Sequence, residues 1–313
     1  MTSVRLIAAW LLLALSACNV SSDFQEPIAQ FSTATGEAQT ALADLDSNAA
    51  KELTALRHAD AIAAPTRVSR VEGCTPQANG CIVSLAPDTA SDDQGGPLTV
   101  SSIIPKHVQA MREISLYAKG LDDIVKADAT ATVKTGLDTA SAAAAQLAAL
   151  AGKQYEAAVN AFSVPFNAAA TWAFGEYQES IKLHALREAT RRMQTVLPDA
   201  TAKFGEAADL AHLVAVTRLF DTFADKQTAF GIDASPENLD AYLEAAQRLD
   251  VALQVKPSEV FQQLNLAHQE LAAALESDDI TFGDAILQIG RLVTKVEQLV
   301  DIAQDFKKAA ATN

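Results

Sequence analysis

Residues 284–303 read DAILQIGRLVTKVEQLVDIA and carry the strongest periodic signal in the chain. Apolar residues recur there at spacings that alternate between three and four, namely at Ile286, Ile289, Val293, Val296, Val300 and Ala303. In an α-helix this spacing places the side chains on one face. The stretch therefore predicts a long helix whose apolar face packs against other helices.

Two segments before this stretch show the same alternation. The first starts at Ser235-Pro236-Glu237, which combines a capping residue, a proline for the first helical position and an acidic residue for the first turn. Its expected core positions are Leu239, Tyr242, Ala246, Leu249 and Leu253. The second segment follows Pro257, and its expected core positions are Val260, Leu264, Ala267, Leu271 and Ala274. The loops between these helices are short, so neighbouring helices are expected to run antiparallel.

The helical pattern continues toward the N-terminus. Residues 28–64 predict one long helix, and residues from 103 onward predict helices to the end of the chain. Two stretches within that second region look alike, Lys119-Gly120-Leu121-Asp122 and Lys134-Thr135-Gly136-Leu137-Asp138. Each glycine either ends a helix and precedes an aspartate cap, or lies inside a longer helix.

Residues 65–102 differ from the rest because they are rich in Val, Ser, Thr, Gly and Pro. Residues 66–72 and 81–85 predict two short strands, and residues 98–100 predict a third. The stretch 73–80 between the first two strands reads GCTPQANG, which is typical of turns. The segment therefore predicts a small β-hairpin inserted into a mostly α fold, an up-down bundle of long helices.

The first nineteen residues resemble the signal peptide and lipobox of bacterial lipoproteins. Arg5 precedes a short apolar run, and that run ends in Leu15-Ser16-Ala17-Cys18. The run is too short to span a bilayer, whose hydrocarbon core is roughly 30 Å thick. The resemblance implies removal of residues 1–17 and attachment of lipid to Cys18. A buried N-terminal helix with a chance cysteine, and secretion without lipid, are the two alternatives.

The resemblance also bears on location and redox environment. Residue 19 is asparagine and not the aspartate that marks inner-membrane retention in this class, so the outer membrane is favoured over the inner one. Residues 18–27 are expected to form a lipidated tether, followed by a helical domain at 28–313. The periplasm is oxidising, so Cys74 and Cys81 are expected to form a disulfide that staples the hairpin. A zinc site is the weaker alternative because no histidine lies near these two cysteines.

The charge of the chain limits its partners. It has 24 Lys and Arg residues against 39 Asp and Glu residues, which gives a formal net charge of −15. A basic stripe that would neutralise phosphates is absent from the sequence, so nucleic acid is excluded as a partner. Anionic lipid heads are disfavoured for the same reason, and attachment to the membrane is expected to depend on the lipid alone.

Candidate sites for ligands are few. Aromatic residues gather at Phe162, Phe166, Trp172, Phe174 and Tyr177, which predicts either an apolar ligand pocket or an ordinary core. Glu206, Asp209 and His212 can share one helix face, but a single such motif does not make the paired motifs of a di-iron bundle. We therefore expect no metal, no cofactor and no catalytic residue.

These features together predict a non-enzymatic, lipid-anchored periplasmic lipoprotein that binds or scaffolds another envelope component. The hairpin around Cys74 and Cys81 is the expected contact, since a rigid insertion loses little freedom on binding. The alternative function is binding of an apolar small molecule or lipid between the helices, near Trp172.

Overall fold

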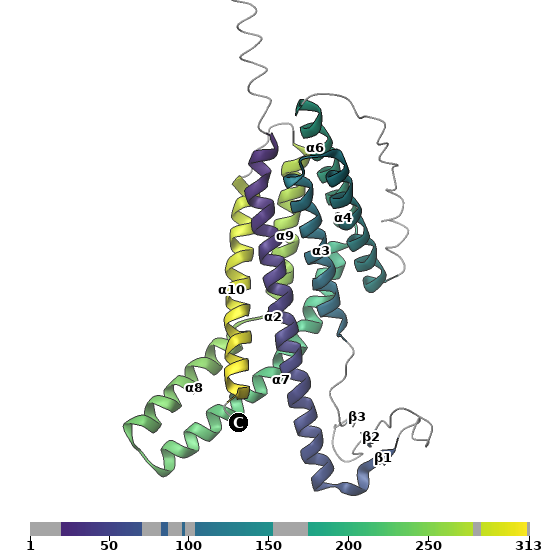
Figure 1. Ribbon diagram of the computed structural model, residues 1–313. Helices are drawn as coiled ribbons and strands as arrows, with labels where there is room; N and C mark the ends of the chain where they lie inside the picture. The colour runs from purple at the N-terminus through teal and green to yellow at the C-terminus, as the bar shows by residue number, and fades with distance from the viewer. Residues whose placement is uncertain are drawn as a thin grey trace, which may run out of the picture. The chain divides into compact units, whose positions relative to one another are not determined.

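The computed structural model describes residues 20–70, 83–86, 96–97, 104–152, 175–277 and 283–311. In these residues the chain forms eight α-helices, one turn of 3-10 helix and three short strands (Figure 1). The predicted mostly α fold and its bundle of long helices are confirmed. The chain divides into two compact units, each built from three separate stretches.

Unit 1 comprises Met1–Thr40, Lys106–Ala207 and Pro257–Val300. Its helices are the first part of α2 (Val20–Ala63), α3 (Lys106–Lys126), α4 (Thr130–Ala151), α6 (Gly175–Gln194), the start of α7 (Leu197–Ile232), α9 (Pro257–Glu276) and most of α10 (Gly283–Ala311). The largest buried side chains of this unit are Phe24, Phe31, Tyr117, Phe204 and Phe261. Helices α2, α7 and α10 each have residues in both units.

Helix α2 corrects the predicted tether. Residues 18–27 were expected to form a tether before a helix that begins near residue 28, but α2 already begins at Val20 and contains Pro27 inside it. Phe24 and Ile28 are buried at the helical spacing of four, and Phe31 continues the same face. This apolar face outweighs the polar Ser-Ser-Asp sequence and the proline that suggest a linker.

Helix α9 agrees with its predicted face, and α10 agrees with its predicted face only at Ile289, Val296 and Ala303. All five predicted core residues of α9 are buried. In α10 the buried set is Ala285, Ile289, Leu292, Val296, Leu299, Ile302, Ala303 and Phe306. The predicted Ile286 is instead 50% exposed. This helix carries two overlapping sets of apolar residues. Leu292 and Leu299 fill the core at the places predicted for Val293 and Val300.

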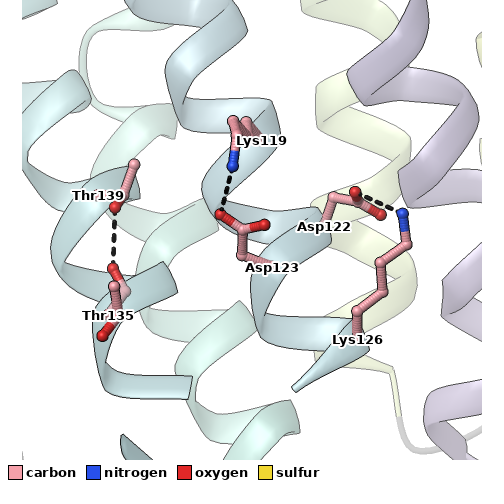
Figure 2. Close-up of polar contacts among 6 residues, drawn as sticks. All are labelled: Lys119, Asp122, Asp123, Lys126, Thr135 and Thr139. Carbon is pink, nitrogen blue, oxygen red and sulfur yellow. Dashed lines mark hydrogen bonds and ion pairs between the residues drawn. The ribbon is translucent and has the colours of Figure 1, made fainter. Parts of the chain in front are cut away.

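The two glycines of the look-alike stretches lie inside α3 and α4, where the backbones of these helices approach closely. A Cβ atom on Gly120 would lie 2.7 Å from the Ala140 nitrogen, and one on Gly136 would lie 2.8 Å from Cγ1 of Ile124. The glycines therefore allow backbone contact and do not end helices. Asp122, a possible cap in the sequence, instead pairs with Lys126 at 2.7 Å, and Lys119 pairs with Asp123 at 2.9 Å (Figure 2).

Unit 2 comprises Ala41–Pro105, Ala208–Lys256 and Asp301–Asn313. Besides the remaining parts of the shared helices it contains the 3-10 turn η1 (Pro65–Arg67), the strands β1 (Val68–Arg70), β2 (Val83–Leu85) and β3 (Gly96–Pro97), and α8 (Pro236–Gln254). Its buried apolar residues include Leu42, Leu45, Leu85, Leu219 and Phe306.

The strands form one antiparallel sheet in the order β1-β2-β3, with Val68 opposite Leu85. The Arg67 guanidinium donates to the Ala86 carbonyl from Nε at 3.0 Å and from Nη2 at 2.7 Å. Both predicted strands are thus present in the described residues, and the first begins at Val68 because Pro65–Arg67 form the 3-10 turn. The third predicted strand at 98–100 lies outside the described residues, as do Cys74 and Cys81, so their disulfide stays a prediction.

Candidate functional site

Most of the residues predicted to carry function lie outside the described part of the chain. This applies to the lipidation residue Cys18, to Cys74 and Cys81, and to Phe162, Phe166, Trp172 and Phe174. Tyr177 lies in α6. The roles assigned to these residues therefore stay predictions. None of the helices described by the structure has the length and hydropathy of a membrane span.

The described residues instead present an arm, defined here as residues 208–254. It consists of the C-terminal part of α7, a short turn and α8, which runs back along α7 (Figure 1). The turn is built as the sequence predicts. Ser235 caps α8 by accepting a hydrogen bond from the Asn238 backbone nitrogen at 3.3 Å, and Pro236 occupies the first turn. The Asn238 amide also donates to the Asp233 carbonyl at 2.9 Å.

Aromatic rings join the two helices of the arm near its tip. Tyr242 of α8 stacks against Phe230 of α7, with ring centroids 6.1 Å apart and an interplanar angle of 2°. Phe223 lies 5.4 Å from the same tyrosine ring. Contacts of this kind add about 0.5–1.5 kcal/mol each beyond the burial of apolar area. They keep the two helices together at the tip.

The base of the arm is held by a buried histidine. His212 of α7 donates a hydrogen bond from Nε2 to the Ala252 carbonyl of α8 at 2.8 Å, and Phe306 of α10 meets its ring edge-on at 6.0 Å. Burial lowers the pKa of His212, which opposes the smaller raising effects of the Ala252 hydrogen bond and of Asp209. His212 thus joins the two helices as a neutral side chain. No three metal-ligating side chains come together anywhere in the described ranges.

Ion pairs connect the rest of unit 2 around this base. Arg218 of α7 lies 3.6 Å from Glu52 of α2, and Lys307 of α10 lies 2.5 Å from Asp44 of α2. Each pair is partly exposed, and such pairs contribute at most about 1 kcal/mol. The buried apolar contacts therefore hold unit 2 together, and the ion pairs add to them.

The outward side of α7 is apolar as well. Leu210, Leu213, Thr217 and Phe220 are all exposed and follow spacings of three, four and three. We call these four residues the outer stripe. The exposed fractions of Leu210, Leu213 and Phe220 are 68%, 61% and 55%. A stripe of this spacing on a helix surface has the pattern of a seam between two helices.

The outer stripe lies on the side of α7 that faces away from the core. Two residues further along an α-helix correspond to a rotation of about 200°, since there are 3.6 residues per turn. His212, Ala215 and Leu219 follow the stripe residues by two positions, and all three are buried. Helix α7 is therefore apolar on two opposite sides, and only one of them is used within the described structure.

Helix α8 also differs from its predicted face. Its buried residues are Ala245, Leu249 and Ala252. Leu239 and Leu253, which were expected in the core, are exposed, and so is Leu243. The small alanines let α8 approach its neighbours closely, and the larger leucines remain outside. The predicted core face of α8 is wrong at these two positions.

A second polar feature lies in the core of unit 1. The Tyr117 hydroxyl of α3 and Nε2 of His268 in α9 form a hydrogen bond of 2.8 Å, and both side chains are fully buried. Nδ1 of His268 has no hydrogen-bond partner among the described residues. Burial lowers the pKa of His268 to about 3 and raises that of Tyr117 well above its usual value. The sequence gives no sign of this pair, because the two residues lie 151 positions apart.

A shallow groove of about 360 Å³ opens on the surface of unit 1. It is lined by Asp23, Glu26, Pro27, Gln30 and Ile286. The groove is small and lies beside the exposed isoleucine of α10. It offers carboxylates but no buried polar group that would orient a ligand.

Comparisons of the chain with protein-family models, with curated proteins and with solved structures gave no match.

Proposed function

We propose that this chain is a lipid-anchored helical-bundle protein of the bacterial cell envelope, facing the periplasm, that binds another envelope component and catalyses no reaction. The observation that carries the binding role is the outer stripe of α7. Attachment to the membrane is proposed to depend on lipid at Cys18, in the outer membrane more than in the inner one.

The outer stripe supports binding because its exposure costs free energy that a partner would recover. Burial of one leucine or phenylalanine side chain contributes about 1.5–3 kcal/mol. Single exposed apolar residues are common on protein surfaces, but a line of them on one helix face is typical of an interaction site. Leu210, Leu213 and Phe220 form such a line.

The start of α2 supports a position close to the membrane. Only Asn19 lies between the proposed lipidated Cys18 and the first residue of α2. Phe24 is buried in unit 1 less than two helical turns later. A chain anchored at Cys18 would therefore place unit 1 at the membrane surface, without a long flexible linker.

The two other surfaces proposed from the sequence are separate from the arm. The hairpin connection that contains Cys74 and Cys81 remains a second possible contact. The apolar pocket near Trp172 remains the basis of a small-molecule function. Both lie outside the described residues, so the arm is the surface on which the binding role is tested.

A photo-crosslinking amino acid at position 213 in the full-length lipidated protein tests this proposal in living bacteria. Position 287 is the matched control, because Leu287 is also an exposed leucine on a helix. We expect a discrete covalent adduct from position 213, containing one envelope component at constant stoichiometry, and none from position 287. The same pattern of adducts from both positions, or no adduct from position 213, would contradict the proposal.

A further inference from the structure

We infer that the partner of the outer stripe is an amphipathic helix with an apolar face flanked by lysine and arginine. This inference rests on the proposed function, because it names the chemistry of the partner at the same surface. It follows from the spacing of the stripe and from the charges beside it.

The spacing selects a helix as the partner. Leu210, Leu213, Thr217 and Phe220 repeat at three, four and three residues, which is the a/d pattern of a two-helix seam. A partner helix with the same repeat can insert its side chains between these four over about three turns. An extended strand has a side-chain period of two and cannot match this spacing along the stripe.

The charges beside the stripe select a basic partner. Asp209 and Asp221 border the outer stripe on α7, and Asp225 lies about one turn beyond Asp221. Asp221 and Asp225 are exposed. The arm has eight acidic residues, which are Asp209, Asp221, Asp225, Asp233, Glu237, Asp240, Glu244 and Asp250. Its three basic residues are Arg218, Lys226 and Arg248. Arg218 pairs with Glu52 and Arg248 pairs with Glu244, so two of the three basic side chains are engaged within the protein.

The same charges disfavour a second copy of the chain as the occupant. In an antiparallel pair of α7 helices centred on Ala215, Asp209 and Asp221 of both copies would border the same short seam. Like charges at such flanking positions select against a pairing. Each copy also carries a formal net charge of −15, which adds long-range repulsion. An anionic lipid surface is disfavoured for the same reason.

Peptide binding to the purified full-length protein tests the inference. Three fluorescent helical peptides of about 20 residues have leucine at the a and d positions and differ only in their flanks, which are Lys, Gln or Glu. We expect the Lys-flanked peptide to bind at least tenfold more tightly than the Glu-flanked peptide, with the Gln-flanked peptide between them. Raising the salt concentration should weaken only the Lys-flanked complex toward the Gln-flanked one.

Matched variants locate the binding site. Leu213→Gln should weaken binding of the Lys-flanked peptide roughly tenfold or more, since it removes one buried apolar side chain. Leu287→Gln, at an exposed leucine elsewhere, should leave binding unchanged. Asp221→Asn together with Asp225→Asn should weaken the Lys-flanked peptide several-fold and leave the Gln-flanked peptide unaffected.

The other outcomes separate the inference from the proposed function. Equal binding of all three peptides, lost in Leu213→Gln, would overturn the basic partner and leave a helix-binding arm. No peptide binding, with a dimer that dissociates in Leu213→Gln, would make a second copy the occupant and overturn the inference. Binding to phosphatidylcholine vesicles that depends on Leu213 would mean that the outer stripe binds lipid, and this result would overturn the inference as well. Failure to bind any of these probes also overturns the inference. The proposed function is then tested separately by the crosslinks from position 213.

Discussion

The buried Tyr117–His268 pair makes the stability of unit 1 sensitive to acid. Nε2 of His268 is satisfied by the Tyr117 hydroxyl, and its Nδ1 atom has no partner among the described residues. A proton added to this ring would create a charge in an apolar core. Unfolding exposes the ring to water, where its pKa returns to about 6.5.

Stability should therefore fall as the pH is lowered through the window between the two pKa values. The folded protein holds the pKa of His268 at about 3 against the ordinary 6.5, so the unfolded state binds more protons between these limits. From pH 7 to pH 5 this residue alone should lower the free energy of unfolding by about 2 kcal/mol. Burial also lowers the pKa of His107 and of His212, which adds to the effect in the same direction.

Paired substitutions isolate the contribution of His268. Tyr117→Phe alone leaves Nε2 of His268 unpaired and should cost about 1–3 kcal/mol at neutral pH. Tyr117→Phe combined with His268→Leu removes both polar groups, so the pH dependence in urea unfolding should become shallower by about 2 kcal/mol between pH 7 and pH 5. His184→Gln, at an exposed histidine, should keep the original dependence. An unchanged slope in the double variant would assign the acid sensitivity to other groups.

Replacing glycine by alanine should lower stability where α3 and α4 approach closely and raise it at an open position of α10. Gly120→Ala and Gly136→Ala insert a methyl group where the facing helix lies within 3 Å, and each should destabilise the protein by about 1–3 kcal/mol. The added methyl group of Gly290→Ala, at an exposed position of α10, would meet nothing within 4 Å. This substitution should stabilise the protein by up to about 1 kcal/mol, because alanine favours the helix. Urea denaturation measures all three, and stabilisation by Gly120→Ala would show that α3 and α4 do not approach as described.

At the scale of single helices, the register of α10 is open to a direct test. Ile289 is fully buried and Ile286 is 50% exposed, although the alternating pattern predicts both in the core. Ile289→Ala should cost about 2–5 kcal/mol by leaving a cavity, whereas Ile286→Ala should change stability by less than about 0.5 kcal/mol. If thermal or urea unfolding shows equal losses of stability for the two variants, Ile286 lies in the core as the sequence pattern predicts.

Helices α9 and α10 show where prediction from sequence succeeds and where it stops. Helix α9 has one apolar face, so its core positions follow from spacing alone. Helix α10 has two overlapping apolar sets, and spacing cannot tell which of them meets the neighbouring helices. The choice depends on the shape of the surface that the helix covers, and that surface is formed by residues far away in the sequence.

The short β-sheet of unit 2 leaves one covalent prediction to test. Residues 71–82 connect β1 to β2 and contain Cys74 and Cys81. A disulfide between these residues should stabilise the protein by about 2–3 kcal/mol on the chain-entropy estimate. Peptide mapping of the unreduced periplasmic protein should show the linked pair. Free thiols at both positions, titrated with an alkylating reagent under denaturing conditions, would rule the disulfide out.

At the scale of the whole molecule, the proposed lipid on Cys18 determines whether the protein is attached to the membrane. Cys18→Ser should abolish metabolic labelling with an alkyne-tagged palmitate and release the mature protein into the soluble periplasmic fraction, because lipid is the proposed attachment. Cys74→Ser is the matched control and should keep both the label and the membrane association. Membrane retention of Cys18→Ser after a high-salt wash would point to a different mode of attachment.

The candidate site shows a similar limit to prediction. The turn at Ser235-Pro236-Glu237 and the antiparallel pair of helices around it follow from capping chemistry and short loops. The outer stripe does not follow, because residues 208–220 are apolar on nearly every side and only the packed structure shows which side is covered. The sequence pattern of an exposed apolar helix face is the same as that of a buried one.

The hydrogen bond between His212 and Ala252 has a further consequence for how this protein can evolve. It brings the two ends of the arm together, so the chain enters and leaves the arm at nearly the same point. Insertion of seven residues in each helix would lengthen the arm by about 10 Å, at 1.5 Å per residue, without rearranging the rest of the chain. The reach of the arm can thus vary among descendants of this gene independently of the bundle that supports it.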